Sequence, residues 1–421
     1  MRTTKLVRRL VGVEHTVVES VETEPAVGGA VLVVRVRPDR SARGRCSRCG
    51  RRCRGYDRGD GRRRWRGLDF GTVPVVLEAD APRVFCRTDG VVVAAVPWAR
   101  SPRSRFTRDF EDTCAWLAAH APGSVVSELL RTTWRSVAAV VTRVVAEAAG
   151  RADRLDGLRR IGIDEIAFRK GHRYLTCVVD HDTGRLVWAA EGRNAETVGK
   201  FFDALGPARA GALTHVSADG AQWIHTVVRA RAPQAVLCLD PFHVVAWATG
   251  ALDTVRREVT AQLRAAGRKD AAAALGGTRW ALVRNPEQLS ATQRGTLASI
   301  SHTNRRLYTA YLLKEQLRAV FQAKGGHGHA LLAGWLAWAR RSRLPAFTKL
   351  AKTVTRFLPI LRNTLDHALS NARSEATNTH LRVLTRRSYG FHSPEALIAM
   401  AMLTRGGLCP PLPGRAAQLS T

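Results

Sequence analysis

The sequence "IGIDEIAFRKGHRYLTCVVDHDTGRLVW" at residues 161–188 contains three consecutive β-strand patterns. Each is a short run of β-branched and aromatic residues that ends in charged or Gly-containing turns. Two more strands are predicted in "ALTHVSADG" (212–220) and "QAVLCLD" (234–240), and a helical stretch precedes each of them. A three-strand meander followed by the order β-α-β-α-β predicts a mixed α/β sheet.

Two aspartates lie on this predicted sheet. Asp164 is within the first strand and Asp219 ends the fourth, while Glu375 lies on a later predicted helix. A buried, unpaired carboxylate is costly, so it needs a partner or a metal. Three such oxygen ligands could hold two divalent ions about 3.5–4 Å apart, as metal-dependent phosphoryl transfer requires. The alternatives are a turn residue for Asp219, which precedes Gly220, and a solvated surface charge for Glu375.

The charge of the chain indicates a polyanionic partner. Lys plus Arg number 66 and Asp plus Glu number 35, so the net charge is +31. Nucleic acid is the commonest such partner, and a ribosome-bound or membrane-surface protein is the alternative. No segment approaches the roughly 20 apolar residues of a membrane span, and residues 1–10 lack the apolar stretch of a signal peptide. We therefore expect a cytoplasmic, nucleoid-associated protein with no membrane partner.

A cluster of cysteines near the N-terminus suggests a zinc site. Cys46 and Cys49 have the C-x2-C spacing of a metal knuckle, and Cys86 can supply a third thiolate. Structural zinc takes four ligands, usually Cys or His. Asp89 and Cys53 are both candidates for the fourth. The alternative is a degenerate finger that no longer binds zinc.

The same region is rich in arginine. Residues 43–66 carry eleven Arg with aromatic residues between them, a density that favours contact with DNA phosphates. The alternative is a basic face that is merely solvated. The predicted DNA-contacting residues of this region are Arg51, Arg52, Arg62, Arg63, Arg64 and Trp65.

Residues 123–150, "GSVVSELLRTTWRSVAAVVTRVVAEAAG", have the pattern of a short helix, a tight turn and a longer helix. Ser124 and Thr133 are predicted N-caps. In a helix-turn-helix the second helix enters the major groove by its first residues, here Trp134, Arg135 and Ser136. Helical hairpins without DNA binding are the alternative, and the position beside a basic finger favours DNA.

Four ordered stretches resemble a known family: residues 161–188, "VSADGAQ" (216–222), "LDPFHVVAWATGALDTVRRE" (239–258) and "NARSEATNTHLRVLTRRSYGF" (371–391). They look like the successive motifs of DDE transposases of bacterial insertion sequences, most closely of the ISL-three family. The resemblance implies an RNase H-like domain with a helical insertion and an N-terminal zinc finger. It carries the catalytic triad, and with it two Mg²⁺ or Mn²⁺ ions, onto three residues, Asp164, Asp219 and Glu375.

Two further positions need comment in the light of this resemblance. Asp240 and His243 belong to the third motif and could lie near the metals or touch phosphate. The other interpretation is that Asp240 caps the helix that Pro241 begins, and we favour it. Asp89 departs from the Cys or His that the family tends to carry there. Glu165 is expected to face away from Asp164, because neighbouring strand residues point to opposite faces.

We therefore expect a multidomain α+β and α/β protein. The predicted regions are 1–99 (basic and finger-like), 104–152 (helix-turn-helix), 158–405 (RNase H-like, with a helical insertion at about 255–355) and 406–421 (a flexible tail). The expected partners are double-stranded DNA, both as terminal inverted repeats and as target, and a second copy of the chain in a homodimer on paired ends. The alternatives are a non-catalytic DNA-binding regulator and a nuclease of the same fold without strand transfer.

Overall fold

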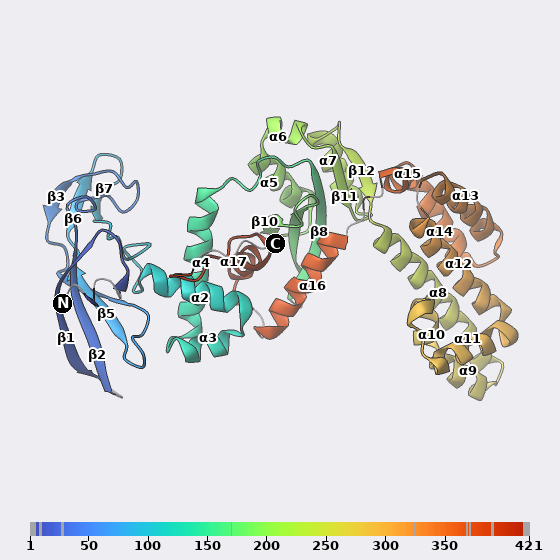
Figure 1. The fold of residues 1–421 in the computed structure, drawn as a ribbon. Coiled ribbons are helices and arrows are strands. Elements are labelled where there is room, and N and C mark those ends of the chain that lie inside the picture. Colours follow the sequence, from blue (N-terminus) through green and yellow to red (C-terminus); the bar gives the residue numbers. More distant parts are fainter. Residues whose placement is uncertain are drawn as a thin grey trace. The chain divides into compact units, whose positions relative to one another are not determined.

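The computed structural model of the chain describes residues 6–7, 11–26, 29–169, 171–323, 325–367, 369, 372–388 and 391–415 (Figure 1). The chain forms two compact units. Unit 1 consists of residues 1–153 and 385–421, and unit 2 of residues 154–384. In the described part of the chain, no helix is both long and apolar enough to cross a membrane.

Unit 1 begins with two small sheets. The first has the order β1-β2-β5-β4, in which β2 and β5 are parallel and the other pairs are antiparallel. The second is antiparallel with the order β3-β6-β7. The bounds are β1 (Thr16–Ala26), β2 (Gly29–Pro38), β3 (Arg54–Asp57), β4 (Arg62–Arg66), β5 (Val75–Asp80), β6 (Arg83–Cys86) and β7 (Gly90–Val93).

The helices that lie wholly in the described part of unit 1 are α2 (Arg108–His120), α3 (Gly123–Leu129), α4 (Trp134–Arg151) and α17 (Pro394–Arg405). Thr133 caps α4, since its side chain accepts a hydrogen bond from the Ser136 amide, as predicted. The prediction for Ser124 is wrong. Helix α3 begins two residues earlier than a cap at Ser124 would require, at Gly123, and Pro122 occupies the cap position, where its fixed φ suits an extended residue.

Unit 2 is built on the mixed sheet that the sequence predicts, with the order β10-β9-β8-β11-β12. Strands β8, β9 and β10 form the antiparallel meander, and β11 is parallel to both β8 and β12. Helices α5 and α7 connect the later strands. The bounds are β8 (Arg160–Arg169), β9 (Arg173–Asp180), β10 (Leu186–Glu191), α5 (Ala195–Leu205), α6 (Pro207–Gly211), β11 (His215–Ala218), α7 (Gln222–Arg231) and β12 (Val236–Leu239).

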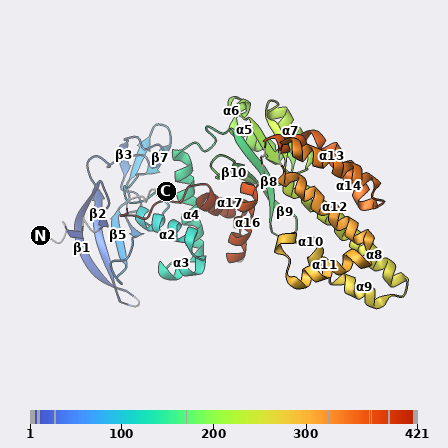
Figure 2. The same cartoon turned by 45° about the vertical axis from the view of Figure 1, so that its right-hand side comes forward.

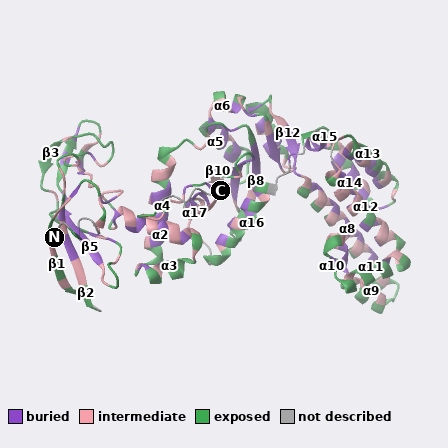
Figure 3. Ribbon diagram, viewed as in Figure 1, coloured by how far each residue is buried: buried purple, intermediate pink, exposed green. Residues whose placement is uncertain are grey.

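A largely helical region follows β12 and extends beyond the sheet within unit 2 (Figure 2). Its buried residues join those of the sheet in one continuous hydrophobic cluster, visible as the purple segments of Figure 3. Its elements are α8 (Pro241–Ala265), α9 (Lys269–Gly276), α10 (Arg279–Val283), the 3-10 turn η1 (Pro286–Gln288), α11 (Ala291–Thr303), α12 (Arg305–Gln322), α13 (Gly325–Arg341), α14 (Pro345–Arg356) and α15 (Leu358–His367).

Helix α15 protects the outer edge of the sheet. The Thr364 hydroxyl accepts from the Leu239 amide at 2.9 Å, and Asn363 Nδ2 donates to the Leu237 carbonyl at 3.0 Å. These bonds satisfy polar groups of β12 that an edge strand would leave open. Helix α16 (Ala372–Arg387) comes next in the chain and brings the last predicted catalytic residue.

Candidate functional site

The sheet places the two predicted aspartates side by side. Strands β8 and β11 are parallel and pair Ile163 with Ala218, so the next residues, Asp164 and Asp219, come level with each other at the end of β11. Residues in register on parallel neighbours point to the same face. Asp164 is buried and Asp219 is half-buried.

Helix α16 brings Glu375 to this face through a neighbouring residue. Asn378, one helical turn after Glu375, donates from Nδ2 to Asp164 Oδ2 at 2.7 Å, and both residues are buried. Positions three apart share a helix face, so Glu375 is directed to the same region. Its Oε1 is buried without a hydrogen-bond partner among the described residues.

The electrostatics of this region reflect crowded carboxylates. Burial raises the pKa of Asp164, and the charges of Asp219 and Glu375 act in the same direction. Burial likewise raises the pKa of Glu375, and Asp240 raises it further. Carboxylates that raise one another's pKa are the arrangement that a divalent cation relieves. In the described part of the chain the carboxylate oxygens of Asp164, Asp219 and Glu375 do not form a mutually close ligand group. Their side chains would have to change rotamer to bind one ion together.

Asp240 and His243 lie at the N-terminus of α8. The Asp240 side chain accepts from the Phe242 amide at 3.2 Å, and Pro241 is the first residue of the helix, so the helix-cap interpretation is confirmed. His243 Nε2 is 3.7 Å from Asp240 Oδ2. Because the charge of Asp240 also reaches Glu375, the cap is part of the same acidic region.

Two side chains that the sequence did not single out, those of His225 and Trp247, hold the turn after β11. His225 is buried, and its Nε2 lies 2.7 Å from the Asp219 carbonyl, which can only accept, so this nitrogen carries the proton. Gly220 packs so closely that an added Cβ would come within 2.5 Å of the Trp247 ring. The turn that carries Asp219 is thus fixed from two sides.

Glu165 pairs away from Asp164 but is not electrically isolated. Its carboxylate forms an ion pair of 2.7 Å with Arg193. Burial raises its pKa to about 7. The charge of Asp219 also raises this pKa, whereas Arg193 lowers it. The signal that could have revealed Asn378 was its spacing of three residues from Glu375; Glu165 and His225 carry no comparable sequence signal.

The finger region gathers four potential zinc ligands. The ligand atoms of Cys46, Cys49, Cys86 and Asp89 all lie within 4.8 Å of one another. Asp89 Oδ2 is 3.3 Å from Cys46 Sγ and 3.4 Å from Cys86 Sγ, and Cys49 Sγ is 3.6 Å from Cys86 Sγ. Tetrahedral zinc with 2.3 Å bonds to sulfur would space the sulfurs about 3.8 Å apart, so this donor set fits the ion.

Hydrogen bonds within the cluster favour the ionised forms of two of its potential ligands, Cys86 and Asp89. The amides of Asp89 and Thr88 donate to Cys86 and lower the pKa of its thiol. Hydrogen bonds from the surrounding thiols, that of Cys46 first, lower the pKa of Asp89. Of the two candidates for the fourth ligand, Asp89 is inside the cluster. Cys53 is not part of this mutually close set. Its thiol donates to the Arg51 carbonyl at 3.4 Å and also interacts with Cys86 beside the cluster.

The predicted DNA contacts of the finger divide into two groups. Arg51 and Arg52 are exposed, and Arg63 lies over the Trp65 ring at 5.7 Å. Arg62 and Arg64 are held by carboxylates, Glu78 in both cases and also Glu24 for Arg64. The prediction for Trp65 is wrong as the protein is folded, because its ring is 2% exposed and packs edge-on against Trp98 in the core of the first sheet.

The start of α4 presents the side chains predicted for it. Trp134 is 48% exposed, with the Arg135 guanidinium 5.3 Å from its ring centre. The Trp134 ring is also stacked on the His392 ring, with 4.5 Å between their centres. Ser136 is half-buried and its hydroxyl lies 3.0 Å from that of Thr133. Two of the three predicted residues are therefore open to a ligand, and the third closes the cap.

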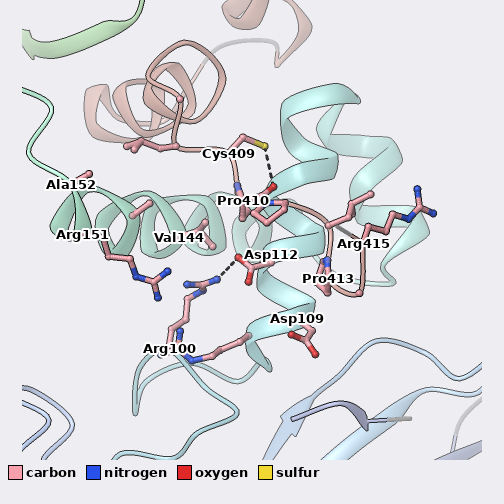
Figure 4. Close-up of a pocket in the computed structure, with 17 residues that line it drawn as sticks. Arg100, Asp109, Asp112, Val144, Arg151, Ala152, Cys409, Pro410, Pro413 and Arg415 are labelled. Atoms are coloured by element: carbon pink, nitrogen blue, oxygen red, sulfur yellow. Dashed lines mark hydrogen bonds and ion pairs between the residues drawn. The ribbon is translucent and has the colours of Figure 1, made fainter. Parts of the chain in front are cut away.

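A cavity of about 550 Å³ in unit 1 lies between α2, α4 and the C-terminal segment (Figure 4). Arg100 reaches into it and forms ion pairs with Glu111, Asp112 and Glu147.

The expectation of a flexible tail is corrected for residues 407–415. They line this cavity, and Leu408 is buried, because prolines restrict the chain and an apolar side chain anchors it. Residues 416–421 lie outside the described part. None of the predicted site residues lines the cavity.

Comparison with known sequences gives a consistent result. Residues 161–401 match the ISL3 DDE family described as "Transposase". Residues 42–89 match the "zinc-finger of transposase IS204/IS1001/IS1096/IS1165", and residues 94–145 match the "Helix-turn-helix domain of transposase family ISL3". The transposase for insertion sequence element IS1557 from two strains of Mycobacterium tuberculosis is 51% identical, over 99% of this chain and 98% of the relative. The transposase for IS1001 from Bordetella parapertussis is 28% identical over 93% and 95%.

Proposed function

The chain belongs to the ISL3 family of transposases, and we propose that it cuts the ends of its own insertion sequence and joins them to target DNA. The observation that carries the proposal is the hydrogen bond from Asn378 to Asp164. It attaches α16 to the sheet, so that Glu375 shares one acidic region with Asp164 and Asp219.

We assign Asp164, Asp219 and Glu375 as the carboxylates that hold two Mg²⁺ or Mn²⁺ ions. Buried carboxylates that raise one another's pKa and an unpaired Glu375 oxygen support this assignment. When bound, such ions lower the pKa of water and stabilise the charge on attacking and leaving oxygens. The residues of the chain hold the acids in place: Asn378 orients Asp164, and His225 fixes the backbone at Asp219.

The chemistry consists of two phosphoryl transfers. Water first attacks the phosphodiester at the end of the element, a bond from phosphorus to the 3′ oxygen breaks, and a free 3′-hydroxyl results. This hydroxyl then attacks a phosphodiester of the target and displaces the target's own 3′ oxygen. No Ser or Tyr nucleophile is needed, because the protein forms no covalent bond to DNA.

Recognition of the terminal inverted repeats is assigned to unit 1. We propose that zinc is held by Cys46, Cys49, Cys86 and Asp89 and keeps the basic finger folded. Exposed arginines there, Arg51 and Arg52 among them, would contact phosphates, and the start of α4 would enter the major groove through Trp134 and Arg135. Asp240 and His243 would lie beside the metal site, where His243 can face a phosphate.

The regional plan is part of the proposal: 1–99 as finger region, 104–152 as helix-turn-helix and 158–405 as catalytic region with an insertion at about 255–355. The matched ranges 42–89 and 161–401 fall inside the first and third of these. A homodimer on paired ends is expected, because two ends must be joined in one reaction.

The test uses purified full-length protein, Mg²⁺ and a labelled duplex that spans one end of the element. We expect a break at the boundary with the wild type, none with Asp164→Asn or Glu375→Gln, and unchanged binding of the duplex by both variants. The matched control is Asp203→Asn, which removes an exposed carboxylate of the same unit. Cleavage by either triad variant at the wild-type rate would overturn the triad, and binding without any cleavage by the wild type would favour a DNA-binding regulator.

A further inference from the structure

One stretch of the helical region of unit 2 carries cations and no acids. From Gln316 to Leu365 the sequence contains no Asp or Glu. Six cations of this stretch lie together on and between α13 and α14, and all six are exposed: Arg340, Arg341, Arg343, Lys349, Lys352 and Arg356. We call this set the α13–α14 basic ridge. The two helices are neighbours within the helical region (Figures 1 and 2).

The cations of the ridge are not neutralised within the protein. No described residue forms an ion pair with any of the six, in contrast to Arg256, Arg306 and Arg318 of the same region. Arg340 donates to the Thr355 hydroxyl and Arg341 to the Ala337 carbonyl, and both of these acceptors are neutral. The charges therefore remain available to an external anion.

The fold keeps these side chains on one surface. Helix α14 buries Phe347, Leu350, Ala351 and Val354 on one side. Lys349, Lys352 and Arg356, spaced by three and four residues, lie together on another side. An ordinary solvated helix face would be expected to mix charges of both signs, and this face has only one.

The turn between the two helices supplies a second, independent observation. Arg343 has φ 54°, the left-handed region that glycine or asparagine adopts at less cost. A long cationic side chain stands at a position where the backbone disfavours it. Such local strain is typical of positions that serve a function.

The C-terminal end of α14 contacts the residues that hold the Asp219 turn. Phe357, which ends α14, has its ring 5.7 Å from that of Trp247 and 5.7 Å from that of His225. These two residues hold the turn that carries Asp219. At 1.5 Å per helical residue, Lys349 lies about 12 Å along the axis from Phe357. A duplex places roughly seven phosphates within that length, counting both strands, so several could be contacted at once.

We propose that the α13–α14 basic ridge holds the phosphate backbone of the target duplex beside the acidic site. Exposed lysines and arginines along a helical hairpin attract phosphates through their charge, a term that does not depend on sequence and so suits DNA of variable sequence. The assignment to target DNA rests on the proposed function, whereas the assignment to duplex DNA rests on the ridge itself.

The experiment compares full-length proteins with the substitutions Arg343→Asn, Lys349→Gln and Lys352→Gln made together. Asn fits the left-handed turn, so the fold should be kept, and a thermal unfolding curve checks this. The matched control is Arg264→Gln, Arg268→Gln and Lys269→Gln, three exposed cations at the end of α8, in the connection and at the start of α9, where the sequence continues with the acid Asp270. Each protein is first saturated with unlabelled end duplex, and binding of a labelled duplex of unrelated sequence is then measured from 50 to 200 mM salt.

Each phosphate contact contributes about 0.9 to the slope of log K against log salt, so we expect the ridge variant to lose about 3 from that slope. The control should lose less than 1, and binding of the end duplex alone should be unchanged in both. An unrelated-duplex slope equal to the control's would overturn the ridge. A loss confined to the end duplex would overturn its assignment to target DNA. Tighter binding of an RNA duplex of the same length would overturn DNA as the partner. None of these readings requires cleavage, so a failed triad and a failed ridge are distinguishable.

Discussion

Replacing Glu375 by Gln distinguishes two effects of its negative charge on the stability of the fold: destabilisation by burial without metal, and stabilisation by a bound ion. Burial and Asp240 raise the pKa of Glu375 above its usual 4.5, so the folded protein binds the proton more tightly than the unfolded chain does. Its protonation therefore favours the fold at low pH, and this contribution is lost as the pH rises through the folded-state value. At neutral pH without divalent ions, the Gln variant should unfold at the same temperature as the wild type or higher.

Magnesium should reverse the order of the two unfolding temperatures. An ion at 100 times its dissociation constant stabilises the folded state by about 2.7 kcal/mol. For unit 2, which spans Arg154–Leu384, that corresponds to a rise in Tm of roughly 5–10 °C, at about 2–4 °C per kcal/mol for a domain of this size. Gln keeps a neutral oxygen but loses the charge, so its rise should be much smaller.

The assay is differential scanning calorimetry at pH 7.5 with EDTA and with Mg²⁺, and Asp203→Asn is the control. The control should keep the full Mg²⁺-dependent rise, because this exposed carboxylate pairs with Arg231 at 3.0 Å outside the acidic region. An equal rise in the Glu375→Gln variant, or a Tm several degrees lower than wild type in EDTA, would refute the reasoning.

Three further substitutions test single contacts. Asn378→Ala removes a charge-assisted hydrogen bond worth about 1.5–3 kcal/mol, so the Mg²⁺ concentration for half-maximal cleavage should rise roughly tenfold or more, and an unchanged requirement would show that Asp164 needs no such support. Trp65→Ala should lower the free energy of unfolding of unit 1 by about 3–5 kcal/mol in a urea titration, whereas a residue that serves only DNA would leave it unchanged. Thr133→Ala should destabilise α4 by about 1 kcal/mol, measured by thermal unfolding, and Thr133→Ser should restore most of the loss.

The sheet of unit 2 could be predicted because its signals are local. Short apolar runs predicted five strands and two connecting helices, and they placed Asp164 within one strand and Asp219 at the end of another. The spacing of Cys46 and Cys49 likewise indicated a metal cluster before any geometry was known. The register that sets Asp164 beside Asp219 was not available from the pattern, because the pairing of β8 with β11 joins residues more than fifty positions apart.

Contacts between distant segments explain what could not be predicted. Asn378 reaches Asp164 across 214 positions. Its spacing of three residues from Glu375 places it on the same helix face but does not identify Asp164 as its partner. The sequence left the fourth ligand open between Asp89 and Cys53, and it could not show that the β6–β7 turn brings the Asp89 carboxylate among the thiols of Cys46, Cys49 and Cys86. Trp65 looked like part of a DNA surface because arginines flank it, but alternation along β4 turns its ring into the core.

Contacts between distant segments also decide how much positive charge each basic segment keeps after folding. They change which of two segments is expected to bind DNA more clearly. Density along the sequence pointed to residues 43–66, yet folding places Arg62 and Arg64 against Glu78, so part of that charge is already neutralised. Residues 340–356 have fewer cations, but with no acid in their stretch of sequence and no ion-pair partner among the described residues they keep their full charge. An external polyanion responds to the charge that remains after internal pairing. The segment with the weaker sequence signal is therefore the one where neutralising three side chains should reveal a DNA contact most clearly.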